Sequence, residues 1–100
     1  MPSPREQLSD DLVEFLAFIG IFNSKKSKGE LDGKDFWLIE FSKKDCQASL
    51  RVYGVGFIQL KIEISKRGLI KRDSRVFKSL SPLKDLLIDW ILKENHTWFK

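Results

Sequence analysis

The sequence predicts a single α+β domain in two layers, with an antiparallel sheet of three to four strands. An N-terminal and a C-terminal helix are expected to pack on one face of this sheet, in the order α-β-β-β-(β)-α. Apolar residues recur at helical spacing near both ends, and the middle of the chain alternates apolar with polar residues. The 100 residues, 42% of them hydrophobic, are enough for one core but not for two.

The first helix is expected to follow a flexible arm, residues 1–8, which contains two prolines. Ser9 is the predicted N-cap, because Asp10 and Asp11 after it suit the positive end of a helix dipole. Residues 12–22 are apolar on nearly every face of a helical wheel, including Phe22, which predicts a helix buried on several sides. Residues 9–100 then form the one domain.

The middle of the chain is predicted to form the sheet. Residues 23–33 contain three lysines and two glycines and are expected to be a loop. Strands are expected at 36–41, 47–53 and 57–64, and a poorer fourth strand at 69–77. In the clearest pattern, one face of the strand carries Ile58, Leu60, Ile62 and Ile64 and the other carries Phe57, Gln59, Lys61 and Glu63. That alternation predicts one buried and one exposed face.

Positive charge is concentrated in the predicted sheet. The net charge is +4, yet residues 43–78 hold ten basic and three acidic side chains. Arg51 and Tyr53 share one face of their strand, and Phe57 and Lys61 share one face of the next. If the strands are neighbours, these four residues form an exposed surface that neutralises phosphates and stacks bases. A basic rim at the sheet edge is expected from Lys66, Arg67, Lys71, Arg72 and Arg75.

The first functional hypothesis is therefore a small non-enzymatic module that contacts nucleic acid, RNA or DNA, through this basic face and edge. The competing interpretation is a solvated basic face, because lysines on exposed strands also prevent aggregation. No known nucleic-acid-binding motif, such as a GXXG loop or a paired Cys/His finger, occurs in the chain.

The alternative hypothesis is a protein-interaction module, as a homodimer, an adaptor or an inhibitor in a larger complex. The last helix, with Ser81 as the predicted N-cap, carries Ile88 and Leu92 opposite its core stripe. Trp98 and Phe99 near the C-terminus add two aromatic anchors. The competing interpretation is that these residues fold back onto the domain's own core.

Catalytic and metal-binding patterns are sparse. A single cysteine, Cys46, and a single histidine, His96, form neither an internal disulfide nor a Cys/His zinc site. A remote alternative is a divalent-metal-dependent nuclease that uses Asp45 and Glu63, but Glu63 and Lys66 are one residue too far apart for a carboxylate–x–lysine step. We expect no enzyme activity, no metal and no small-molecule cofactor.

The sequence also predicts that the chain does not enter a membrane. Its longest apolar stretch, residues 12–22, is about half of the roughly 20 residues that a membrane span needs. Acidic residues precede this stretch where a signal peptide would carry positive charge. We therefore expect a cytoplasmic protein.

Overall fold

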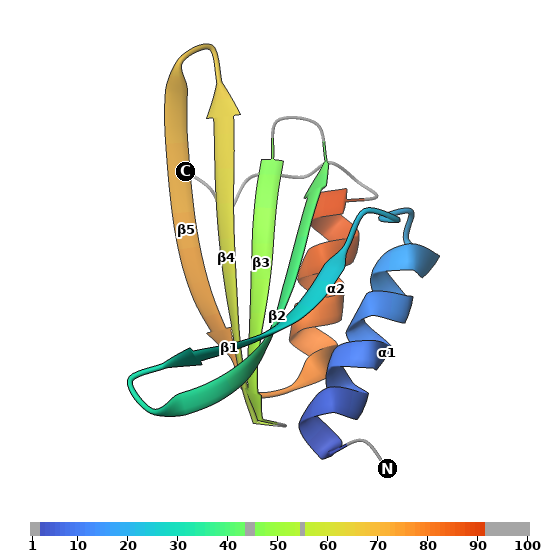
Figure 1. Ribbon diagram of the computed structural model, residues 1–100. Coiled ribbons are helices and arrows are strands. Elements are labelled where there is room, and N and C mark those ends of the chain that lie inside the picture. The colour runs from blue at the N-terminus through green and yellow to red at the C-terminus, as the bar shows by residue number, and fades with distance from the viewer. Residues whose placement is uncertain (1–2, 44–45, 55, 92–100) are drawn as a thin grey trace.

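The structure is a computed structural model that describes residues 3–43, 46–54 and 56–91. Its elements follow the order helix, five strands, helix (Figure 1). They are α1 (Pro4–Phe18), β1 (Lys25–Leu31), β2 (Lys34–Lys43), β3 (Cys46–Gly54), β4 (Phe57–Lys66), β5 (Leu69–Phe77) and α2 (Leu80–Ile91).

The five strands form one antiparallel sheet in the order β1-β2-β3-β4-β5, so each strand pairs with its neighbours in the chain. Both helices lie on the same side of this sheet (Figure 1). The predicted α+β class is thus confirmed, and residues 69–77 form the fourth of the expected strands. The fifth strand, β1, was not expected.

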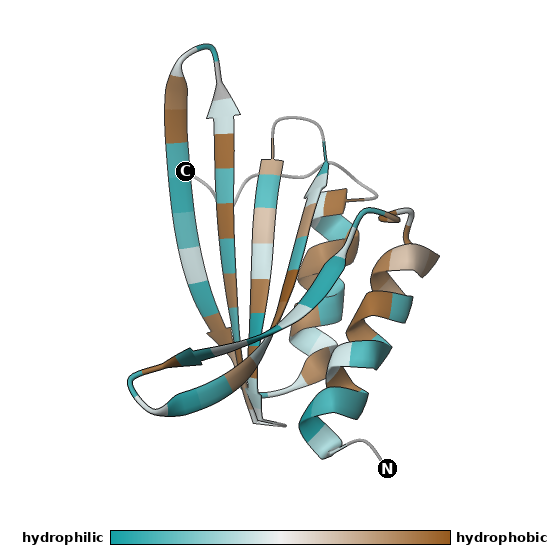
Figure 2. Ribbon diagram, in the orientation of Figure 1, coloured by the Kyte–Doolittle hydropathy of each residue, from teal (hydrophilic) through white to brown (hydrophobic). Residues whose placement is uncertain are grey.

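The core lies between the helices and the sheet. In the central strands the buried residues alternate along the chain, and Leu50 of β3 stands directly opposite Leu60 of β4. Figure 2 shows this alternation as a change of colour from residue to residue along β4. The helices contribute Leu12 and Leu16 of α1 and Leu87 of α2, none of which is exposed. Burial on this one side leaves the opposite side of the sheet uncovered by helices.

The start of α1 corrects the sequence prediction, which placed its N-cap at Ser9. The helix begins at Pro4 with Ser3 as N-cap, and the Ser3 hydroxyl accepts a hydrogen bond from the Glu6 backbone amide at 3.2 Å. Ser9 instead lies inside the helix, fully buried, and its hydroxyl donates to the Arg5 carbonyl at 2.9 Å. Residues 4–8, expected in a flexible arm, form the first turns of the helix.

The end of α1 also differs from the prediction. The apolar run continues to Phe22, but the helix ends at Phe18 because Gly20 takes a positive φ of 101°. The amides of Gly20 and Ile21 donate to the Ala17 and Leu16 carbonyls, the pattern of a Schellman motif. Ile21 is thereby turned into the core, whereas Phe22 beyond it is 83% exposed.

Residues 23–33 are not the expected loop, since most of them form the edge strand β1. A two-residue turn, Asp32 and Gly33, joins β1 to β2, and both residues have the positive φ of a type I′ hairpin turn. The sequence of β1 shows no alternation of apolar and polar residues, because β1 is an edge strand with polar side chains on both faces.

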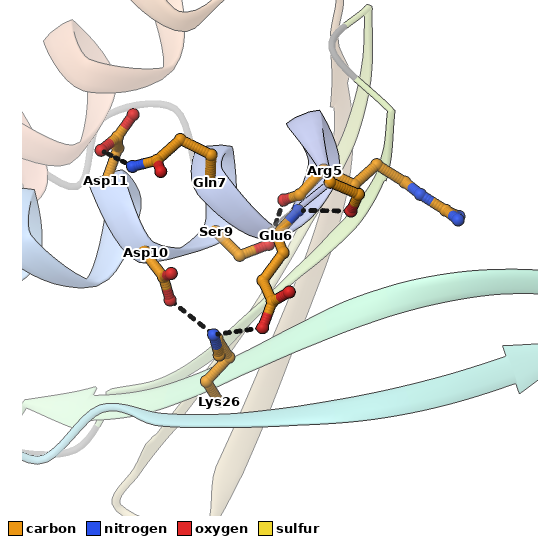
Figure 3. Close-up of polar contacts among 8 residues, drawn as sticks. Arg5, Glu6, Gln7, Ser9, Asp10, Asp11 and Lys26 are labelled. Atoms are coloured by element: carbon orange, nitrogen blue, oxygen red, sulfur yellow. Dashed lines mark hydrogen bonds and ion pairs between the residues drawn. The ribbon is translucent and has the colours of Figure 1, made fainter. Parts of the chain in front are cut away.

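An ion-pair cluster attaches β1 to α1 (Figure 3). The Lys26 ammonium lies 2.5 Å from Asp10 Oδ1 and 3.6 Å from Glu6 Oε1, and it also lies 4.6 Å from the centre of the Trp37 ring. The hydrogen bond to Asp10 is the main reason that the pKa of Lys26 is raised above its ordinary value of 10.5. Lys26, which lies in the segment predicted to be a loop, therefore connects the helix layer to the sheet.

We expect Lys26→Met to lower the free energy of unfolding at neutral pH by about 0.5 kcal/mol, because the ion pair is partly exposed. A raised lysine pKa stabilises the fold below the unfolded-state value, and this contribution is lost as pH rises through the folded-state value. Urea denaturation at pH 7 and pH 11 should therefore show a smaller alkaline loss of stability in the variant. Lys28→Met is the control, since Lys28 also faces Trp37 but at 5.7 Å. An equal alkaline loss in both variants would contradict the role of Lys26.

Candidate nucleic-acid interface

The side of the sheet opposite the helices, which we call the open face, carries the residues that alternate with the core positions. Strand pairing places Arg51 of β3 between Leu38 of β2 and Gln59 of β4. Ser49 lies between Glu40 and Lys61 in the same way. The charged residues of the open face are Lys25, Lys34, Glu40, Arg51, Lys61, Glu63 and Arg72.

The charge on the open face is mixed rather than uniformly basic. Arg72 forms an ion pair with Glu63 at 3.2 Å, and Lys25 stands directly opposite Glu40. Lys61, which is exposed, lies in a row between two serines, Ser49 and Ser74. Lys61 is therefore an exposed cation of this face with neutral residues on both neighbouring strands, as Arg51 has in a half-buried position.

Three aromatic rings gather at one end of the open face. The ring centres of Phe36 and Tyr53 are 5.3 Å apart, and those of Tyr53 and Phe57 are 5.1 Å apart with an edge-on angle of 86°. The guanidinium of Arg51 lies 5.1 Å from the centre of the Phe36 ring. Phe36 is buried at 7% exposure, whereas Phe57 at the other end of the series is 48% exposed. The structure thus brings Arg51, Tyr53 and Phe57 together, as expected.

The β1–β2 hairpin supplies the floor of this aromatic cluster. Phe36 pairs across the strands with Gly29, and a Cβ atom on Gly29 would lie only 2.6 Å from the Phe36 ring. The ring therefore covers the Gly29 backbone, which only glycine permits. Arg51 Nε is buried above this ring, and within the part of the chain that the structure describes no group accepts a hydrogen bond from it.

A hollow of about 980 Å³ crosses the part of the open face away from the aromatic cluster. All five strands contribute to its lining, with Lys25 from β1 and Lys61 from β4 on opposite sides. Asn23 closes one end, where its side-chain amide donates to the Ser42 carbonyl at 2.9 Å. The concavity suits an extended polar ligand that runs across the strands.

The predicted basic rim is divided between the two faces of β5. Register places Arg72 on the open face opposite Glu63, whereas Lys71 and Arg75 stand opposite the core-facing positions Ile64 and Leu60. Arg75 also contacts Asp73 at 3.3 Å on that side. Because side chains alternate along a strand, these cations do not share one surface.

The other two cations of the rim lie at the β4–β5 hairpin turn. Arg67 occupies the turn itself with a positive φ of 53°. Lys66 ends β4, and its side chain is outside the described part of the structure.

The predicted protein interface is only partly described. Ile88 is half-buried and packs against the core cluster, so it does not form a separate apolar face. Leu92, Trp98 and Phe99 lie outside the described residues. Two aromatic residues at and just beyond the end of α1 are exposed, Phe18 at 87% and Phe22 at 83%, and sequence reasoning missed Phe22, which it placed in the buried helix. The Gly20 in the apolar run was the signal that the helix would end before Phe22.

Of the two carboxylates of the nuclease hypothesis, the structure describes only Glu63, which forms an ion pair with Arg72. Asp45 lies outside the described residues, as does His96. Cys46 is buried. Among residues 3–43, 46–54 and 56–91 no three His, Cys, Asp or Glu side chains are grouped closely enough to hold a metal ion. The nuclease hypothesis therefore has no geometric support in this part of the chain.

Comparisons with protein-family models, with curated proteins and with solved structures found no match to this chain. Neither helix in the described part of the chain is long and apolar enough to cross a bilayer.

We expect Gly29→Ala to lower the free energy of unfolding by about 1–3 kcal/mol, because the new methyl group must displace the Phe36 ring. Gly54→Ala is the matched control, since a Cβ there meets nothing within 4 Å. That variant should change stability by no more than about 0.5 kcal/mol. Urea denaturation followed by circular dichroism measures both, and equal effects would show that Gly29 is not tightly covered.

Proposed function

We propose that this domain is a non-enzymatic module that binds nucleic acid on its open face. The observation that carries the proposal is the placement of Arg51, Tyr53, Phe57 and Lys61 on one uncovered face of neighbouring strands, with the Phe57 ring half-exposed. Cations attract phosphates and release their counterions, and exposed aromatic rings stack on bases. An open sheet offers both groups to an extended ligand.

The electrostatics of the open face favour modest affinity. Lys25 and Lys61 line the same hollow, so phosphates crossing the sheet would meet a cation on each side of it. Glu40 and Glu63 line it too and reduce the total positive potential. Each phosphate contact adds a roughly constant salt dependence, and few such contacts are available here. Stacking on Phe57 is thus expected to contribute a large share of the binding energy.

We expect Lys61→Glu to weaken binding of a fluorescein-labelled single-stranded oligonucleotide about tenfold, because it replaces a phosphate contact by repulsion. Lys71→Glu is the matched control: both lysines are exposed and lie on adjacent strands, but on opposite faces of the sheet. Both changes alter the net charge equally, so long-range attraction to the ligand falls by a similar amount. Fluorescence anisotropy at low and physiological salt measures the affinities.

The comparison of the two variants decides whether the open face is the site. A loss confined to Lys61→Glu supports it, together with a salt dependence whose slope falls by about one relative to the unsubstituted protein. An equal loss in both variants would indicate unspecific attraction to the whole domain. Absence of measurable binding at physiological salt would overturn the proposed function.

A second candidate function, a protein-interaction module, is favoured by the exposure of Phe18 and Phe22. Large apolar side chains that are exposed close together are typical of protein contact sites. These two phenylalanines lie on either side of the Schellman turn that ends α1.

If the contact is made with a second copy, Phe18→Ser combined with Phe22→Ser should convert a dimer into a monomer in sedimentation-velocity experiments. An apolar interface should respond little to salt. A chain that sediments as a monomer before any substitution would remove the homodimer from this candidate function.

A further inference from the structure

We propose that a hollow beside Phe57 is a pocket for one unstacked nucleobase, so that the ligand of the open face is single-stranded. This inference rests on the proposed function and names its substrate class. The hollow has a volume of about 440 Å³. It lies between the turn of the β1–β2 hairpin and the connection from β3 to β4, where the strand register shifts.

The walls of this hollow are apolar and already in place. Leu31 and Phe57 both line it, and they are 49% and 48% exposed. The Phe57 ring is held by its edge-on contact with Tyr53, which in turn contacts the buried Phe36. A ring fixed in this way loses little conformational freedom when a flat ligand stacks on it. The exposed apolar area therefore favours an occupant with a flat, apolar face.

The rim of the hollow is polar, which selects among flat ligands. Asp32 offers carboxylate acceptors, Lys34 offers an ammonium donor and Gln59 offers an amide that both donates and accepts. A nucleobase has a flat face to stack and an edge of donors and acceptors to meet such a rim. A purely aliphatic ligand would make no hydrogen bond with these rim groups.

The position of Lys61 connects the pocket to the phosphate backbone. Lys61 follows Phe57 by four residues on the same face of β4, a distance of about 13 Å along the strand. A strand whose base is held against Phe57 and which continues along β4 therefore brings a phosphate one or two nucleotides further on to the Lys61 ammonium. A duplex cannot fill the pocket in this way, because its base faces are covered by stacking and its edges by pairing.

The test compares three ligands: an oligothymidylate, an abasic strand with the same number of phosphates, and a duplex of the same length. We expect the unsubstituted protein to bind oligothymidylate about tenfold more tightly than the abasic strand, since stacking on one aromatic ring is lost. Phe57→Leu keeps the apolar bulk but removes the ring, and it should bind both strands alike. Its affinity for the duplex should not change.

Phe22→Leu is the matched control, because it makes the same change at an exposed phenylalanine that does not line the hollow. It should keep the tenfold preference for oligothymidylate. If the unsubstituted protein binds the intact and abasic strands equally and Lys61→Glu weakens both, nucleic-acid binding stands and the base pocket is overturned. If Phe57→Leu retains the preference, the pocket is also overturned. If none of the three ligands binds, both proposals fail.

Discussion

One-sided burial of the sheet is the constraint on which the other features of this structure depend. With both helices on one face, every second residue of β3 and β4 must be apolar, as at Leu50 and Leu60. A shift of one residue in this register would bury Arg51 and Lys61 and expose the core. The same constraint that closes the core thus gathers the residues of the candidate interface on the other side.

The β1–β2 hairpin gives the open face a second, smaller packing centre. Phe36 belongs to the same strand as the core residues Ile39 and Phe41, but its side chain lies on the opposite side, over Gly29. Tyr53 and Arg51 pack against Phe36. These contacts order the end of the sheet where β2 begins and β3 ends, on the side that the main core does not reach. The preformed edge of the candidate pocket is a product of this packing.

Local patterns in the sequence predict the parts of the fold whose burial alternates. The alternation at 57–64 predicted the buried and exposed faces of β4, and with them the shared face of Arg51 and Lys61. It could not predict β1, because an edge strand with lysines on both faces has no alternation. The signal for β1 was instead the Asp32-Gly33 dipeptide, which is typical of a type I′ hairpin turn. The true start of α1 was similarly marked by Ser3-Pro4 with Glu6, a capping pattern that precedes Ser9.

Some residues of the candidate site could be predicted from the sequence and others could not, for a physical reason. Which face of a strand a residue occupies follows from parity along the chain, so Arg51, Tyr53, Phe57 and Lys61 could be grouped. The contribution of Leu31, Lys34 and Phe36 depends on how the β1–β2 hairpin packs on the sheet, which is a tertiary contact with no local signature. Parity along β5 also puts Lys71 and Arg72 on opposite faces of the sheet, although the concentration of basic residues had suggested one basic cluster.

The exposure of β5 has a consequence for the order in which the fold comes apart. Seven of its nine residues are exposed, and only β4 pairs with it. Its backbone hydrogen bonds therefore have little apolar packing to shield them from water. We expect such a strand to open with a smaller free energy than the core around Leu50, so that its amides exchange with solvent while the helices remain docked. The core shared by both helices and by β2, β3 and β4 would then stay folded while the edge strand opens separately.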